Sequence, residues 1–418
     1  MRYRNNWLRN YSLVVKILLV HNFYGSTAPS GENTAFTSEA NLLRNHGHSV
    51  VEFTRNSDEL LRHNLYGKVR GAFSTVWNPA SLRKLKSALR ENRPDIVHIH
   101  NTFPILSPSV LYATSELNIP TVLTLHNYRI GCSAATALRR DEPCTLCLDT
   151  KSVVPALRYG CYRNSRIATL PVSLMIALHN AKKTWEKNVD AFITLTEFQK
   201  EKMVGFGIPE RSLFVKPQFL ENPPQPIPWQ RREAKAVFIG RLYAAKGIHV
   251  LINSWIKWGK TAPPLEIIGD GPIKDELLNM VGKSEAAGSI FFLGNLSHTE
   301  TMKRLSLAQL LILPSICFEG FPMVVQEAYA HGVAIAASNI GSLPHLIAEN
   351  RTGVLFTPGN AESLLASVQK LLADTSALCT MGEQAKQEFD SKYTSGRNYE
   401  ILMRIYASAA MHRGAILN

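Results

Sequence analysis

The chain has 418 residues, of which 45% are hydrophobic and 19% are charged, and Lys and Arg outnumber Asp and Glu by 46 to 33, a formal net charge of +13. This length allows two domains with separate cores, and the composition excludes a disordered chain. The basic balance favours phosphate-bearing ligands or an anionic surface. Nucleic acid is a weaker hypothesis, because no basic module with interleaved aromatic residues occurs.

The first twelve residues contain Arg2, Arg4 and Arg9, but no signal peptide is expected. A signal peptide needs an apolar core after such a start, and the segment 11–20 is interrupted by Lys16. No segment approaches the roughly 18 apolar residues of a membrane span. We therefore expect a cytoplasmic protein, which could act on the inner face of the membrane.

Apolar strands alternate with polar helical stretches along the whole chain, a pattern that predicts parallel sheets with helices on both faces. The expected strands of the first half are 14–20, 49–53, 96–100, 121–126, 191–196 and 213–216. Those of the second half are 236–240, 265–269, 290–294, 310–313, 333–338 and 353–356.

A proline-rich segment, 220–229, separates the two halves and reads as a linker, since proline at this density continues neither a helix nor a central strand. The expected architecture is α/β, with two doubly wound, Rossmann-like domains facing across a cleft. We place the first domain at 13–222, with a cysteine-rich insertion at 130–165, and the second at 223–394.

Ligands of such sheets bind beyond the carboxyl ends of the strands, so the loops that follow strands are the candidate sites. One such loop, Gly240 to Gly247, contains Arg241 and Lys246 ahead of an expected helix. Arg and Lys can bind a diphosphate there, and the glycines let the backbone approach it. The alternative is a pair of solvated cations, which the dipole at a helix start disfavours.

The next loop, Gly269-Asp270-Gly271-Pro272, is a tight turn that could support a nucleoside base against 292–294. Neither half has a G-x-G-x-x-G beside its first strand, which counts against a nicotinamide dehydrogenase.

The segment 314–332 reads P-S-I-C-F-E-G-F-P-M-V-V-Q-E-A-Y-A-H-G. Pro322 is expected as the first residue of a helix that stops at Gly332. Glu319 then lies at the tip of the loop and Glu327 lies in the helix, about 7.5 Å away along its axis. Two such carboxylates could bind two hydroxyl-bearing parts of one long ligand. Alternatively, they are a turn residue and a solvated helix residue.

Four of the six cysteines cluster in the insertion: Cys132, Cys144, Cys147 and Cys161. The C-x-x-C spacing in a cytosolic chain favours a structural zinc site over disulfides. A redox pair with two packed thiols is the alternative. No cofactor is expected for catalysis.

These motifs resemble those of the family 4 glycosyltransferases, which are retaining, nucleotide-sugar-dependent enzymes of the GT-B fold, and the resemblance runs from about 14 to about 407. The loop G-R-L-Y-A-A-K-G resembles the family's phosphate loop, G-D-G-P its turn, and E-G-F-P-M-V-V-Q-E-A its E-x7-E signature.

The resemblance implies a role for each loop residue of the second half. Arg241 and Lys246 would hold the diphosphate, Glu319 would bind sugar hydroxyls, and Glu327 would bind the ribose. The backbone of Gly320, Phe321 and Pro322 would meet the sugar and the distal phosphate.

In the first half, the resemblance makes Gly31 and Glu32 part of a flexible acceptor-side loop, and His126 the histidine that faces the donor sugar. The family usually has two glycines before this glutamate, whereas this chain has Ser30-Gly31. For His126, a buried, hydrogen-bonded histidine at a strand end is the alternative.

The implied reaction transfers a hexose-type sugar from a UDP- or GDP-sugar, by front-face displacement with retention and without a carboxylate nucleophile. The acceptor would be a glycan or a lipid-linked glycan, in the synthesis of a cell-envelope polysaccharide. The alternatives are an inverting transferase, a non-hydrolysing sugar-nucleotide epimerase and a non-catalytic nucleotide-sugar binder.

Two helices bear on partners. The apolar stretch 166–181, with basic residues around it, could rest on an anionic bilayer that carries a lipid-linked acceptor, or could be a core helix that begins or kinks at Pro171. The C-terminal helix, 395–412, is expected from the resemblance to return to the first domain.

Overall fold

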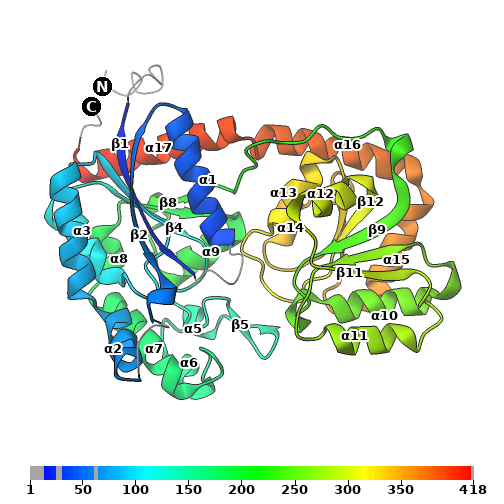
Figure 1. The fold of residues 1–418 in the computed structure, drawn as a ribbon, viewed down its shortest axis with the longest axis horizontal. Helices are drawn as coiled ribbons and strands as arrows, with labels where there is room; N and C mark the ends of the chain where they lie inside the picture. The colour runs from blue at the N-terminus through cyan, green and yellow to red at the C-terminus, as the bar shows by residue number, and fades with distance from the viewer. Residues whose placement is uncertain (1–13, 25–30, 61–64, 416–418) are drawn as a thin grey trace. The chain divides into compact units, whose positions relative to one another are not determined.

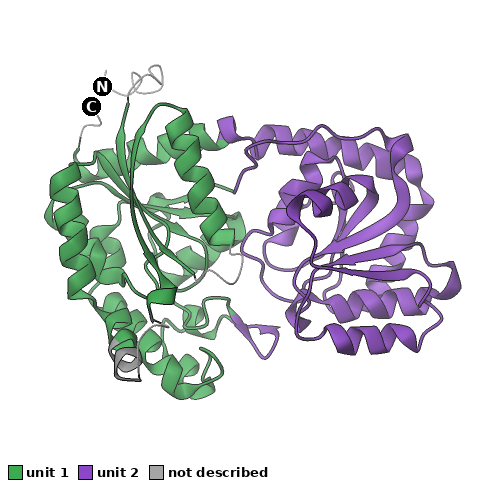
Figure 2. Cartoon of the chain, viewed as in Figure 1, with its two compact units in different colours: residues 1–137, 145–217, 398–418 green, residues 138–144, 218–397 purple. Residues whose placement is uncertain are grey.

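The computed structural model describes residues 14–24, 31–60 and 65–415. The three N-terminal arginines and the stretch 25–30, which leads into Gly31, lie outside these residues. The described chain forms two compact units (Figure 2). Unit 1 comprises described residues of 1–137, 145–217 and 398–418, and unit 2 comprises 138–144 and 218–397.

The sheet of unit 1 has the strand order β2-β1-β3-β4-β7-β8, and every pair in it is parallel. Its strands are β1 (Lys16–Phe23), β2 (Ser49–Asn56), β3 (Ile96–Ile99), β4 (Thr121–Leu125), β7 (Ala191–Thr194) and β8 (Leu213–Val215). The inner strands β3, β4 and β7 are buried along their whole length, as is usual for a parallel sheet covered on both faces.

Helices flank this sheet (Figure 1). They are α1 (Gly31–Asn45), α2 (Leu65–Val76), α3 (Pro79–Asn92), α4 (Leu111–Glu116), α5 (Leu146–Asp149), α6 (Val154–Tyr159), α7 (Arg166–Ala181), α8 (Thr184–Asn188) and α9 (Glu197–Phe206). A side-chain cap fixes the start of α3, where the side chain of Asn78 accepts hydrogen bonds from the backbone N–H groups of Ala80 and Ser81.

The last helix, α17 (Ser395–Arg413), contributes to the core of unit 1. Leu402, Ile405 and Tyr406 pack in one cluster with Leu19 of β1 and Phe36 of α1. The chain therefore ends by completing the hydrophobic core that its first strand begins.

Unit 2 repeats the design with a parallel sheet in the order β11-β10-β9-β12-β13-β14. Its strands are β9 (Glu233–Ile239), β10 (Leu265–Ile268), β11 (Ile290–Gly294), β12 (Ala308–Leu313), β13 (Ala334–Ser338) and β14 (Gly353–Phe356). Its helices are α10 (Ile248–Trp258), α11 (Lys274–Gly282), α12 (His298–Leu307), α13 (Met323–Ala330), α14 (Leu343–Leu346), α15 (Ala361–Ala373) and α16 (Thr375–Lys392).

All twelve expected strands are present, with ends that differ from the expected ones by three residues or fewer, and both sheets are parallel as predicted. An additional pair, β5 (Leu138–Arg139) and β6 (Glu142–Pro143), forms a short antiparallel hairpin in the cysteine-rich segment. Within the described part of the chain, no helix combines the length and the apolar character needed to cross a membrane.

Candidate active site

Glu319 lies in the loop between β12 and α13, and its carboxylate is bound by two neighbours. The ammonium Nζ of Lys246 lies 2.7 and 2.8 Å from its two oxygens, and the hydroxyl of Ser315 donates to Oε1 at 2.6 Å. The side chain of Glu319 is 12% exposed. The sequence predicted Glu319 and Lys246 as ligand-binding residues of two different loops, and in the structure the two side chains form an ion pair.

The charge of Glu319 is set by these contacts. Burial by itself would raise the pKa of this carboxyl, but Lys246, Ser315 and Arg241 outweigh burial and hold the pKa below its ordinary value. Glu319 is therefore ionised at neutral pH, so its oxygens accept hydrogen bonds and do not supply a proton.

Lys246 reaches Glu319 because its loop packs tightly on the loop after β12. Lys246 ends a short 3-10 helix, Ala244–Lys246, and Gly247 follows it with φ of +69°. A Cβ atom on Gly247 would lie 1.7 Å from the carbonyl oxygen of Pro314, so only glycine fits here. The backbone N–H of Ile316 also donates to the carbonyl of Ala245 at 3.0 Å.

Arg241 is exposed in the same loop, and its guanidinium carbon lies 5.2 Å from the ring centroid of Tyr243. The turn Gly269–Pro272 is hydrogen-bonded to this loop, because the backbone N–H of Leu242 donates to the carbonyl oxygen of Asp270 at 2.9 Å. The exposed guanidinium of Arg241 and the ammonium of Lys246 thus belong to one loop, which backbone hydrogen bonds hold in place.

Glycines allow the turn and the loop to touch. A Cβ on Gly269, whose φ is +134°, would lie 2.0 Å from the carbonyl oxygen of Gly240. One on Gly271 would lie 2.3 Å from that of Leu242. Because Gly269 and Gly271 lack a Cβ, the backbones of the loops after β9 and β10 can contact each other.

Helix α13 carries Glu327 and begins at Met323, one residue later than expected. Pro322 is the N-cap, because its ring fixes φ near −71° but its ψ of 110° is extended. No side chain caps this helix start. The N–H of Val325 donates to the carbonyl oxygen of Pro322 at 3.0 Å, and the N–H groups of Met323 and Val324 can meet a ligand oxygen. The helix ends before Gly332, which has the expected positive φ of +65°.

Beside this start, Gly320 is half-buried and Phe321 is 9% exposed, with its ring centroid 5.9 Å from that of Tyr393. The backbone at 320–322 thus runs from the ionised Glu319 directly into the uncapped helix.

Glu327 is 12% exposed, and the imidazole Nε2 of His298 lies 3.2 Å from its Oε1. Burial raises the pKa of Glu327, although His298 opposes that shift. The sequence analysis missed His298, whose only sequence signal is its place directly after Ser297, the N-cap of α12.

In unit 1, His126 follows β4 and lines a pocket with Asn127 and Arg129. The structure places Gly31 and Glu32 in the first turn of α1, which corrects the expectation that they belong to a flexible loop. Glu32 there accepts a hydrogen bond at 2.7 Å from Nδ2 of Asn127, the residue after His126. An acidic residue suits the first turn of a helix, so Glu32 stabilises the start of α1.

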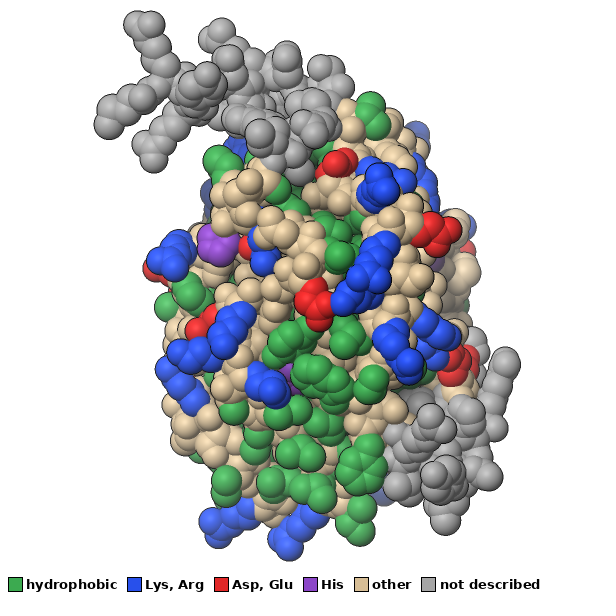
Figure 3. Space-filling view, turned by 90° about the vertical axis from the view of Figure 1, so that its left-hand side faces the viewer, with side chains coloured by type: hydrophobic (Ala, Val, Ile, Leu, Met, Phe, Trp, Pro, Cys, Tyr) green, Lys and Arg blue, Asp and Glu red, His purple; other side chains and the backbone are tan. Residues whose placement is uncertain are grey.

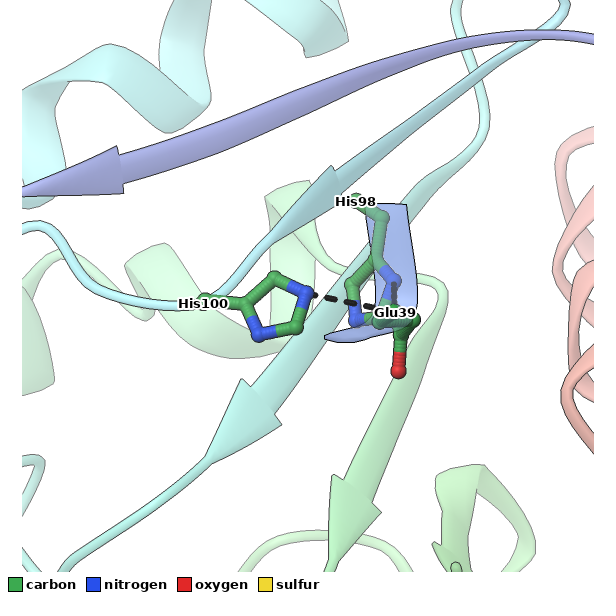
Figure 4. Close-up of side chains that lie close together, drawn as sticks. All are labelled: Glu39, His98 and His100. Carbon is green, nitrogen blue, oxygen red and sulfur yellow. Dashed lines mark hydrogen bonds and ion pairs between the residues drawn. The ribbon is translucent and has the colours of Figure 1, made fainter. Parts of the chain in front are cut away.

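His126 contacts a buried polar network, and Figure 4 shows Glu39, His98 and His100 of it. Nδ1 of His100 is 3.1 Å from Nε2 of His126, and Nε2 of His100 is 3.2 Å from Oε1 of Glu39. His98 Nδ1 lies 2.7 Å from the same oxygen, and the Nζ of Lys216 lies 2.7 Å from Oε2. The sequence analysis missed this network; its only signal is two histidines two positions apart in an apolar strand, hence on one face of it.

Among the described residues, Glu39, His98 and His100 are the only group of three or more potential metal ligands whose ligand atoms lie within 4.8 Å of one another. Burial would raise the pKa of Glu39, but Lys216 and the two histidines outweigh burial and hold the pKa well below its ordinary value. An ammonium 2.7 Å from the carboxylate opposes a metal cation, so the group is best described as a buried ion pair with hydrogen-bonded histidines.

The network assigns a tautomer to His126. Burial lowers the pKa of His100 to about 4, so this histidine is neutral and donates its Nε2 proton to Glu39. Its Nδ1 then accepts a hydrogen bond from Nε2–H of His126. The pKa of His126 is also lowered by burial, which leaves Nδ1 of a neutral His126 as a hydrogen-bond acceptor.

The cysteine cluster has a mixed environment. Cys132 is buried, and Cys144, Cys147 and Cys161 are partly exposed. Cys144 falls in the segment 138–144 of unit 2, and the other three fall in unit 1. No candidate metal group among the described residues includes them. A structural zinc at these cysteines stays a prediction.

Two family models match successive parts of the chain. The model described as "Glycosyltransferase Family 4" matches residues 29–219, and that described as "Glycosyl transferases group 1" matches residues 221–388. Their border, between 219 and 221, lies close to the change from unit 1 to unit 2 between 217 and 218.

Curated relatives agree with these models. A glycogen synthase of Mycobacterium tuberculosis is 33% identical over 162 residues, which span 38% of this chain and 39% of that protein. The match thus spans well under half of this relative. Sulfoquinovosyl transferase SQD2 of Arabidopsis thaliana is 23% identical over 382 residues, which span 86% of this chain and 67% of that protein.

Solved structures share the fold over nearly the whole chain. A glycosyltransferase from Rickettsia africae superposes with a TM-score of 0.68 and 16% identity, covering 95% of this chain and 98% of that one. Alr3699/HepE of Anabaena, in complex with UDP, superposes with a TM-score of 0.64 and 17% identity, covering 94% and 100%. The two parallel sheets and these likenesses show that the fold is GT-B. The two family models, which together match most of the chain, show that it is a glycosyltransferase of family 4.

Proposed function

We propose that this enzyme moves a hexose-type sugar from a UDP- or GDP-sugar to a glycan or a lipid-linked glycan, with retention of the anomeric configuration. The observation that carries the proposal is the bond between Lys246 and Glu319 at the contact between the loops after β9 and β12. A ligand with both phosphate and hydroxyl groups suits this pair, because the Lys246 ammonium can bind phosphate and the Glu319 carboxylate can accept hydrogen bonds from hydroxyl groups.

The phosphate end of the donor would be held by positive groups. Arg241 can bind phosphate oxygens in bidentate fashion, and Lys246 adds a compact charge. The N–H groups at the start of α13, beside Gly320 and Pro322, add dipoles of the right sign. These groups would stabilise the diphosphate as it leaves, so that no carboxylate nucleophile is required.

The sugar end would be held by acceptors. The low pKa of Glu319 suits a carboxylate that accepts hydrogen bonds from sugar hydroxyls, and it does not suit a general acid. Glu327 would accept from the ribose hydroxyls. His126, neutral and with Nδ1 available, would accept a hydrogen bond from the transferred sugar, the role that the family resemblance implies.

Similar proteins support the donor and acceptor classes. Structures of the Anabaena protein hold UDP, UDP with glucose, and UDP-glucose. A relative from Bacillus subtilis, 23% identical and spanning 73% of that protein, is named as a putative teichuronic acid biosynthesis glycosyltransferase. A UDP-sugar donor and a cell-envelope polysaccharide product are the assignments these names favour.

A thermal-shift panel of UDP- and GDP-sugars tests the donor. A cognate donor at a hundred times its dissociation constant adds about 2.7 kcal/mol of stability, so it should stand out in the panel.

Radiolabelled hits are then incubated with and without membrane-derived acceptors. Transfer, or slow release of free sugar, supports the proposal; conversion of the sugar on an intact nucleotide indicates an epimerase, and binding without turnover indicates a non-catalytic protein. The anomeric configuration of the product, measured by NMR, decides between retention and inversion.

A further inference from the structure

Helix α7 of unit 1 has two apolar faces, and only one of them is buried. Val172, Met175 and Ile176 pack in a core cluster with residues of neighbouring elements. Ile167 and Leu170, by contrast, are 87% and 56% exposed, and Leu174 is 47% exposed. The spacing of these three residues places them in one stripe along the helix. Pro171 lies inside α7 and does not end it.

Two neighbouring helices also expose apolar side chains. Helices α2 and α6 both pack against α7. Phe73 of α2 is 65% exposed, and Val154 and Tyr159 of α6 are 66% and 41% exposed. Figure 3 shows hydrophobic side chains gathered on the lower part of one face, with Lys and Arg side chains at its edge. Single exposed apolar residues are ordinary, but a gathering of this kind marks an interaction surface.

The segment that contains α6 and α7 is basic, and the exposed Asp149 and Glu186 lie just outside it. From Thr150 to Trp185 the sequence contains six Lys or Arg residues and no Asp or Glu. Arg163 and Arg166 are exposed at the start of α7, where the helix dipole disfavours cations unless an anion joins them. Lys182 and Lys183 are exposed just after its end. The partner that complements this surface is apolar at its centre and anionic at its edge.

We propose that the face formed by the exposed residues of α2, α6 and α7 docks on a bilayer of anionic lipids, with the apolar stripe in the interface and the basic residues at the headgroups. An amphipathic helix with Leu and Ile on one side and Arg and Lys around it binds such membranes in this way. The docking stands on this surface alone. Its extension, that the sugar acceptor is lipid-linked, rests on the proposed function.

Vesicle sedimentation tests the docking. The full chain is mixed with vesicles of phosphatidylcholine alone and with vesicles that also contain phosphatidylglycerol. We expect binding to the second kind only, and weaker binding as salt is raised. Combining Ile167→Ser, Leu170→Ser and Leu174→Ser should lower the vesicle affinity at least about 100-fold. Combining Arg163→Gln and Arg166→Gln should lower it about 30-fold and weaken its salt dependence.

A matched control replaces three exposed apolar residues on other helices, Val204→Ser, Leu278→Ser and Met411→Ser, and should bind vesicles as the native chain does. Equal binding by the native chain and the α7 variant, or equal binding to both kinds of vesicle, would overturn the proposal. So would a native dimer, seen by analytical ultracentrifugation without lipid, that the α7 variant dissociates. The nucleotide-sugar thermal shift should be unchanged in the α7 variant, so failure of the docking is separable from failure of the proposed function.

Discussion

Replacing Lys246 by alanine removes the ammonium that lies 2.7 and 2.8 Å from the two oxygens of Glu319. If Lys246 stabilises the departing diphosphate, kcat should fall about 10²- to 10³-fold, which corresponds to about 2.7–4 kcal/mol of transition-state stabilisation. The fold should survive. The Lys246 side chain is 29% exposed and Ser315 still donates to Glu319, so the free energy of unfolding should fall by only about 1–2 kcal/mol.

The same substitution should change the pH dependence of the residual activity. Without Lys246, the main influence left on Glu319 is burial, which raises the pKa of this carboxyl. Activity that needs the ionised carboxylate should therefore be lost at a higher pH in the variant than in the native enzyme as the solution is acidified.

The assay is the initial rate of sugar transfer as a function of pH, with circular dichroism to check folding. Lys386→Ala is the matched control, because the Nζ of Lys386 also contacts both oxygens of a carboxylate in unit 2, that of Asp390, at 2.6 and 2.7 Å on the surface of α16. Near-native transfer by a folded Lys246→Ala variant, or an unchanged acid limb, would refute the reasoning.

Two further predictions rest on the structure, and a third rests on the spacing of the cysteines. Lys216→Met should lower the free energy of unfolding by about 3–5 kcal/mol, because it leaves Glu39 buried and unpaired, as urea titration would show. Since the pKa of Glu39 is depressed, its native contribution is present above the ordinary carboxyl range and is lost as pH falls through the depressed pKa. Gly247→Ala should lower the melting temperature more than Gly259→Ala does. Both glycines have positive φ, but only at Gly247 would the added Cβ collide with the carbonyl oxygen of Pro314. Equal melting temperatures of the two variants would contradict this packing. Zinc per chain, measured by mass spectrometry, should be near one if the clustered cysteines bind it.

The sequence predicted the sheets well because their signal is local. An inner parallel strand needs a short run of apolar residues with polar or glycine residues at both ends, and this pattern survives in any tertiary context. The loops after the strands were readable for the same reason, since Gly247 and Gly269 mark positions where the backbone requires glycine. Helix starts were less well defined. Gly31 and Glu32, which were expected in a flexible loop, lie in the first turn of α1.

What the sequence determined by itself was therefore the order of the strands along the chain and the loops that carry the candidate ligands. The tertiary structure alone decided which of those groups meet. Glu39 and Lys216 are 177 positions apart, and Lys246 and Glu319 are 73 apart, so no local pattern links their charges. It also decided which face of α7 is buried, because a helix that is apolar on two sides gives no local reason to prefer either. Pairing and burial depend on what packs opposite each residue, and that is a property of the folded chain.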